Sequence, residues 1–119
     1  FVARGFAGDI PQLTKILIQA ISHRGFALID VLQPCPTLNY FNTLAWFKER
    51  VYELGPEHDV KDKALAFQKA QEWDQKIPLG IFYRVERGVL EKELLPDPEM
   101  ILVNQSLEKK IISLFPEFQ

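Results

Sequence analysis

The chain has 119 residues, of which 47% are hydrophobic and 25% charged, a balance that excludes disordered and fibrous proteins. Its 14 basic and 16 acidic side chains give a formal net charge of -2 and are dispersed, which argues against nucleic-acid binding. No apolar run approaches the roughly 20 residues of a membrane-spanning helix, so no membrane association is expected. The single cysteine, Cys35, excludes an internal disulfide and favours a reducing, cytoplasmic location.

The first third of the chain predicts a strand, a helix and a second strand. Residues 1–4 are typical of a strand, and we expect its neighbouring strands to belong to a segment outside this sequence. Asp9 is placed to cap a helix whose apolar residues recur at helical spacing and which ends near Arg24 and Gly25. Residues 26–32 carry apolar side chains toward both faces, as does a strand covered by helices on each side of a parallel sheet.

Two amphipathic helices are expected next, one over residues 40–54 capped by Asn39 and one over about 61–74 capped by Asp59 or Asp62. Residues 77–85 alternate with a period of two, which predicts a half-exposed strand, less buried than 26–32. Pro78 indicates the beginning of that strand or an edge of the sheet.

An extended connection over 91–99 and a short last helix complete the chain. The apolar residues of that helix are Leu107, Ile111, Leu114 and Phe115. The predicted fold class is α/β, with the strand–helix–strand of a parallel sheet followed by helices and an edge strand.

Cys35 is the residue with the strongest claim to chemistry. It lies between Pro34 and Pro36, which restrict the backbone, at the carboxyl end of a predicted strand, where ligands of open α/β sheets gather. The residues alone leave several readings open. The first interpretation is a buried, inert thiol. The second is a nucleophile, for which neither His23 nor His58 is an evident base. The third is a metal or iron–sulfur ligand whose companion thiolates lie elsewhere.

Other unusual residues have structural interpretations. Asp30 stands in an apolar strand and needs a partner, for which we expect neighbouring loop amides. The glycines of residues 4–8 lack the spacing of a dinucleotide or phosphate loop and indicate a tight turn. His58 is expected to be a solvated loop residue. Four aromatic residues on helical faces are expected to pack in the core, namely Trp46, Phe47, Phe67 and Trp73.

Two blocks of sequence carry a family resemblance. Residues 1–9, FVARGFAGD, and 25–37, GFALIDVLQPCPT, resemble in order and spacing the beta subunit of 2-oxoacid:ferredoxin oxidoreductases. Residues 77–84, IPLGIFYR, are similar to the start of the extension that ends that subunit. The resemblance implies the C-terminal portion of a thiamine-diphosphate-binding subunit, with 1–38 ending the cofactor-binding α/β domain and 39–119 forming the extension.

The resemblance also implies a function. Such enzymes use thiamine diphosphate, Mg²⁺ and a 4Fe-4S cluster to convert a 2-oxoacid, such as pyruvate or 2-oxoglutarate, into an acyl-CoA, with electrons passing to ferredoxin. The implied partners are the alpha subunit, ferredoxin, a 2-oxoacid and coenzyme A. The resemblance makes Cys35 the fourth thiolate ligand of the cluster.

In the family, the other three cysteines and the Gly-Asp-Gly motif that holds magnesium and diphosphate belong to an earlier part of the subunit, and none of them occurs in this sequence. The chain alone is therefore expected to be inactive. Two alternatives stay open: a binding or assembly module that keeps only the scaffold, and a redox-sensing thiol protein.

Overall fold

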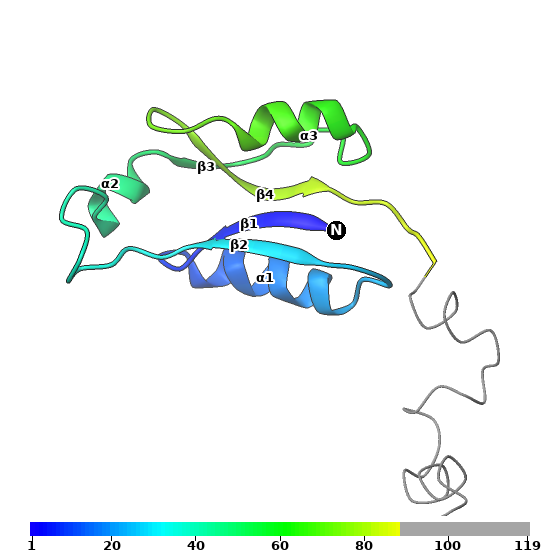
Figure 1. Ribbon diagram of the computed structural model, residues 1–119, viewed down its shortest axis with the longest axis horizontal. Coiled ribbons are helices and arrows are strands. Elements are labelled where there is room, and N and C mark those ends of the chain that lie inside the picture. The colour runs from blue at the N-terminus through cyan, green and yellow to red at the C-terminus, as the bar shows by residue number, and fades with distance from the viewer. Residues whose placement is uncertain (89–119) are drawn as a thin grey trace, which may run out of the picture. The chain divides into compact units, whose positions relative to one another are not determined.

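The computed structural model describes residues 1–88 of the chain, within which Phe1–Glu86 forms one compact unit (Figure 1). The elements follow in the order β1 (Val2–Phe6), α1 (Ile10–Ile21), β2 (Leu28–Leu32), α2 (Leu44–Lys48), β3 (Val51–Glu53), α3 (Lys63–Ala70) and β4 (Ile77–Tyr83). The predicted connection over 91–99 and the predicted last helix lie outside the described residues. Among the helices of residues 1–88, none combines the length and the apolar character that crossing a membrane requires.

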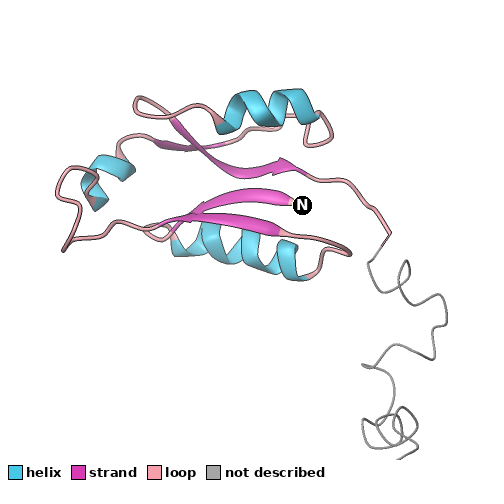
Figure 2. Cartoon of the chain, viewed as in Figure 1, coloured by secondary structure: helices cyan, strands magenta, loops and turns pink. Residues whose placement is uncertain are grey.

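The four strands form one mixed sheet in the order β2-β1-β4-β3 (Figure 2). β1 pairs with β2 in parallel and with β4 antiparallel, and β3 pairs with β4 in parallel. The predicted α/β class is confirmed, but the expectation that the neighbours of the first strand lie outside this sequence is wrong. Strands from both sides of residue 38 share the sheet, and the division into domains at that residue stays a prediction.

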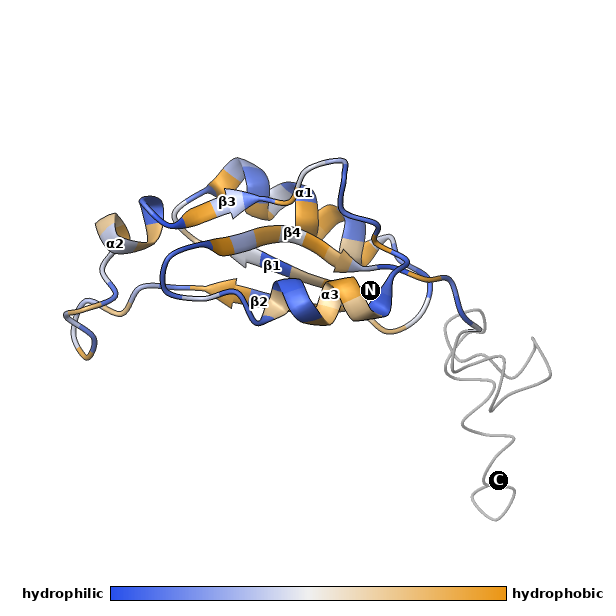
Figure 3. Cartoon of the chain, turned by 90° about the horizontal axis from the view of Figure 1, so that it is seen from above, coloured by the Kyte–Doolittle hydropathy of each residue, from blue (hydrophilic) through white to orange (hydrophobic). Residues whose placement is uncertain are grey.

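Helices α1 and α3 cover opposite faces of the sheet (Figures 1 and 3). Alternate residues of β1 point to opposite faces, so Ala3 packs with Ile16 and Ala20 of α1 while Arg4 reaches the end of α3. Asp9 caps α1 as predicted, because its carboxylate accepts from the backbone N–H of Gln12 at 3.1 Å. The helix ends at Ile21, three residues before the predicted end.

The predicted helix over 40–54 is wrong. Only Leu44–Lys48 is helical, capped by Thr43, whereas Asn39 closes a separate turn by accepting from the N–H groups of Phe41 and Asn42. Val51–Glu53 forms β3 instead, held by a hydrogen bond from the N–H of Ile77 to the carbonyl of Arg50. Pairing with β4 therefore outweighs the helical spacing of the apolar residues in this segment.

The second predicted helix is confirmed in a shorter form, Lys63–Ala70. Asp62 is its cap, since its side chain accepts from the N–H groups of Ala64 and Leu65. Asp59, the other predicted cap, accepts from the N–H of Lys61 in the preceding turn.

The relative burial of the two long strands is the reverse of the prediction. β2 lies at an edge of the sheet and Leu28 is 51% exposed, whereas β4 is interior and Ile77 and Leu79 are 0% and 2% exposed. The predicted edge strand is therefore an interior strand. The period-two pattern gave the wrong burial because the second face of the strand is not polar. That face carries Pro78, Gly80 and Phe82, of which Pro78 and Phe82 are buried.

Pro78 is tolerated inside the sheet because β4 changes partner along its length. The N–H of Ile77 and the carbonyl of Leu79 bond toward β3, so the backbone nitrogen of Pro78 points to the other side. β4 pairs with β1 only from Gly80 onward. Pro78 thus stands at the beginning of its strand, one of the two predicted places, where no ladder donor is needed.

The Arg4 side chain contacts three other elements of the fold. Its Nε donates to Asp30 Oδ2 of β2 at 2.8 Å, and its Nη2 donates to the Ala70 carbonyl of α3 at 3.5 Å. The guanidinium also lies 5.7 Å from the ring centre of Trp73 and 5.3 Å from that of Phe82. Arg4 therefore links β2, α3 and β4 through the centre of the sheet.

We expect Arg4→Met to lower the free energy of unfolding by about 1–3 kcal/mol, because it removes two cation–π contacts and a charge-assisted hydrogen bond from a mostly buried position. Asp30→Asn is the matched control. The Asp30 side chain is 54% exposed, so its loss should cost only about 0–1 kcal/mol. Urea unfolding of both variants measures the difference, and equal costs would contradict this account.

Gly80 adopts a φ of 122°, which side-chain-bearing residues rarely accept. An added Cβ would meet Leu54 at an ordinary contact distance of 3.6 Å, so the backbone alone opposes substitution. Gly80→Ala should therefore cost about 1–3 kcal/mol of stability in thermal or urea unfolding. Gly55→Ala, at a position without positive φ and beside the flexible Glu57 side chain, should stay within about 0.5 kcal/mol of the parent.

Candidate functional site

The Cys35 loop leaves the sheet at the carboxyl end of β2. Phe6 of β1 is in register with Leu32 of β2, and the N–H of Ala7 donates to the Leu32 carbonyl at 2.9 Å. The segments that follow both strands therefore begin side by side. The carboxyl ends of parallel strands are where α/β sheets bind ligands, so the predicted position of Cys35 is confirmed.

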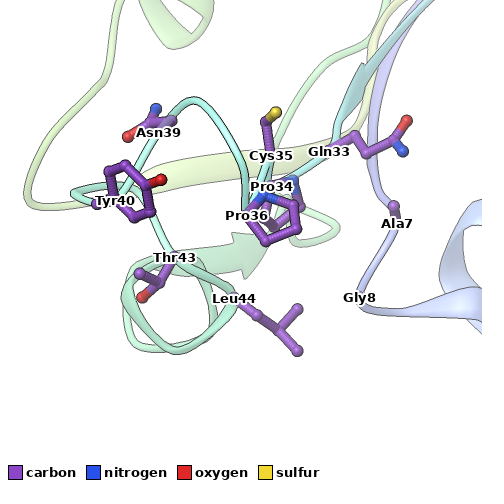
Figure 4. A pocket seen from close by; sticks show the side chains of 10 residues that line it. All are labelled: Ala7, Gly8, Gln33, Pro34, Cys35, Pro36, Asn39, Tyr40, Thr43 and Leu44. Carbon is purple, nitrogen blue, oxygen red and sulfur yellow. The ribbon is translucent and has the colours of Figure 1, made fainter.

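A hollow of about 510 Å³ lies between these two segments. Figure 4 shows the Cys35 side chain rising from the loop above the rings of Pro34 and Pro36, with Asn39 and Tyr40 on the neighbouring turn. The lining is uncharged and consists of Ala7, Gly8, Gln33, Pro34, Cys35, Pro36, Asn39, Tyr40, Thr43 and Leu44.

Gly8, which lines this hollow, is closely packed between Phe6 and Leu44. A Cβ at this position would overlap the ring of Phe6 and approach Leu44 Cδ1 to 2.8 Å. The predicted turn is confirmed for Gly8, whereas Gly5 lies within β1 and packs against Leu13 of α1. The contact between Gly8 and Leu44 brings the start of α2 against the turn between β1 and α1.

The Cys35 sulfur is free, half-buried and hydrogen-bonded. Its Sγ lies 3.5 Å from Thr37 Oγ1, and the N–H of Asn39 donates to the Cys35 carbonyl at 3.0 Å, which closes the turn. The Thr37 hydroxyl first, and then backbone N–H groups of Leu38, Thr37 and Asn39, hold the pKa of the Cys35 thiol below its ordinary value. These donors therefore stabilise the thiolate form of Cys35.

The lining residues supply no general base. No histidine or carboxylate is among them. His58 bonds through Nε2 to the Phe82 carbonyl at 2.9 Å, and His23 stacks on Phe1. Within residues 1–88, no three His, Cys, Asp or Glu side chains gather closely enough to hold a metal ion. Among the residues that line the hollow, Cys35 is therefore the one whose side chain could bind a metal through sulfur.

Three predictions for single residues need correction. The partner of Asp30 is the Arg4 guanidinium rather than loop amides. His58 is 8% exposed, because the loop before α3 folds its ring against β4, and it is not a solvated residue. Of the aromatic residues expected in the core, Phe47 is buried and Trp46 packs beside it, but Phe67 and Trp73 are 67% and 45% exposed.

A polar cluster beside β3 was not anticipated from the sequence. Tyr52 Oη donates to Glu72 Oε2 at 2.5 Å, and Lys69 Nζ donates to Glu72 Oε1 at 2.7 Å. The bond from Lys69 lowers the pKa of Glu72, whereas burial raises the pKa of Tyr52. Each of the three groups has its partner in another, so the cluster ties β3 to the end of α3.

The fold and the site together define an α/β unit with an uncharged cysteine loop at the carboxyl ends of two parallel strands. Comparison with known families identifies the unit more closely. Residues 35–96 match the family described as the C-terminal part of the pyruvate ferredoxin oxidoreductase beta subunit, and the chain belongs to this family. The resemblance seen in the sequence is thereby confirmed.

Named relatives agree with this assignment. The chain is 44% identical over 97 residues to the 2-oxoacid:ferredoxin oxidoreductase subunit beta of Sulfolobus sp, covering 72% of this chain and 32% of that protein. It is 43% identical over 94 residues to the 2-oxoacid:ferredoxin oxidoreductase 1 subunit beta of Aeropyrum pernix, covering 70% and 30%. The chain thus spans about a third of the length of the curated relatives it matches.

A solved structure shows the same fold. The 2-oxoglutarate:ferredoxin oxidoreductase from Magnetococcus marinus, with 2-oxoglutarate, coenzyme A and succinyl-CoA bound, aligns with a TM-score of 0.76 at 29% identity. The alignment covers 95% of this chain and 39% of that one.

The hydrogen bonds to Cys35 make a prediction for its reactivity. Alkylation by iodoacetamide requires the thiolate, so the rate should reach half its maximum at a lower pH than for an unstructured cysteine peptide. Thr37→Val should shift that midpoint upward because the hydroxyl donor is lost, while Thr37→Ser should not. Identical midpoints for the parent and Thr37→Val would contradict this account of the thiol.

Proposed function

We propose that the chain is part of the beta subunit of a 2-oxoacid:ferredoxin oxidoreductase. This enzyme converts a 2-oxoacid to an acyl-CoA with release of carbon dioxide, and passes electrons through a 4Fe-4S cluster to ferredoxin. Membership in the family and the names of the relatives support this reaction class. The ligands in the related solved structure, 2-oxoglutarate, coenzyme A and succinyl-CoA, agree with it.

The observation that carries the proposal is the setting of the Cys35 sulfur. It stands at the carboxyl edge of two parallel strands, in no disulfide, beside an uncharged hollow and within reach of hydrogen-bond donors. A cluster ligand must be a thiolate, and these donors stabilise that form. The residues present therefore fit one corner of a 4Fe-4S cluster, and the three remaining thiolates come from outside this sequence.

The chain's own residues hold this ligand. Pro34 and Pro36 restrict the backbone of the loop that carries the sulfur. The hollow beside the sulfur has an uncharged lining. When bound, the cluster takes up and releases single electrons, which is the chemistry that this thiolate serves.

The remaining assignments follow from the same proposal. Thiamine diphosphate and Mg²⁺ bind to parts of the subunit outside this sequence. The alpha subunit and ferredoxin are the protein partners, and the location is cytoplasmic. Residues 1–38 end the cofactor-binding domain and 39–119 form its extension.

Replacing Cys35 with Ser in the full-length subunit, produced with its partner subunit, should remove or strongly alter the cluster. Iron and acid-labile sulfide per enzyme, and the electron paramagnetic resonance spectrum of the reduced protein, measure this directly. Tyr40→Phe is the matched control, because Tyr40 lines the same hollow and loses only a hydroxyl. An unchanged cluster in Cys35→Ser would show that Cys35 is not a ligand of the cluster.

A further inference from the structure

The Thr37 hydroxyl lies within hydrogen-bonding distance of the Cys35 sulfur. In a neutral thiol, either Cys35 Sγ or Thr37 Oγ1 can donate across their 3.5 Å separation. A thiolate has no proton to give, so the Thr37 hydroxyl then donates to the sulfur. Backbone N–H groups of Leu38, Thr37 and Asn39 add to the effect of this hydroxyl in lowering the pKa of the thiol.

The turn holds Thr37 in place. Pro36 precedes it, and the bond from the Asn39 N–H to the Cys35 carbonyl closes the turn around it. The Asn39 side chain in turn accepts from the N–H groups of Phe41 and Asn42 and donates to Asn42 Oδ1 at 3.0 Å. Because Thr is branched at Cβ, few rotamers are open to it, and the hydroxyl stays near the sulfur.

No fixed charge competes with these donors in the loop. The sequence has no charged residue between Asp30 and Lys48, and the hollow beside Cys35 has an uncharged lining. Within the loop, hydrogen-bond donors rather than charged groups are therefore the main groups that stabilise negative charge on the sulfur. Thr37 is the one member of the donor set that acts through its side chain and can be removed by substitution.

We propose that Thr37 is a positioning residue that raises the reduction potential of the cluster bound by Cys35, an inference that rests on the proposed function. Reduction adds an electron and places more negative charge on the cluster and its thiolates. A donor to the sulfur stabilises the reduced cluster more than the oxidised one. The hydroxyl thus makes the cluster easier to reduce.

The test compares Thr37→Val, which removes the hydroxyl at nearly constant shape, with Thr37→Ser, which keeps it. Both are made in the full-length enzyme, and the cluster is titrated electrochemically while electron paramagnetic resonance follows its reduction. We expect Thr37→Val to lower the equilibrium constant for reduction about tenfold, which is about 59 mV for one electron. Thr37→Ser should match the parent enzyme.

The outcomes separate this inference from the proposed function. A Thr37→Val enzyme with full iron content and the parental potential would overturn the role of Thr37 while leaving Cys35 as a ligand. A normal cluster in Cys35→Ser would instead remove Cys35 as a ligand, and with it the observation that carries the proposed function.

A measurement on the parent enzyme covers the case in which Thr37→Val does not assemble its cluster. Hydrogen bonds from exchangeable protons to the Cys35 sulfur should shift the iron–thiolate stretching frequency in resonance Raman spectra between H₂O and D₂O. The absence of any isotope shift would also overturn the proposal.

Discussion

The parallel pairing of β1 with β2 is the constraint on which the site depends. With Phe6 in register with Leu32, the turn after β1 and the loop after β2 leave the sheet together. Gly8 then allows the first of these segments to lie against Leu44 at the start of α2, beside the cysteine loop. A shift of one residue in this register would turn every β2 side chain to the other face and displace the loop with it.

The parts of the fold that the sequence predicted correctly are those decided by neighbours along the chain. The caps at Asp9 and Asp62 depend on contacts within a few residues. The errors arose where distant segments decide the outcome. Residues 51–53 became a strand because β4 offers them a partner, and Pro78 entered the interior because β4 changes partner at Gly80.

The site was predictable in position but not in detail. Prolines on both sides and a strand before it marked Cys35, and the resemblance to a family assigned its role. Thr37 was missed, although a hydroxyl two residues after a cysteine is a recognisable signal, since Ser and Thr side chains often bond to nearby groups. Arg4 as the partner of Asp30 could not be foreseen, because 26 positions separate them in the sequence.

The stretch between Asp30 and Lys48 carries no charged residue, and this bears on how the Cys35 sulfur responds to salt concentration. At 0.1 M ionic strength, dissolved ions largely screen interactions between exposed charges that are more than about 10 Å apart. Around Cys35 the stabilising groups are dipoles at contact distance, which mobile ions screen far less. The properties of this sulfur should accordingly stay nearly constant between dilute and concentrated electrolyte.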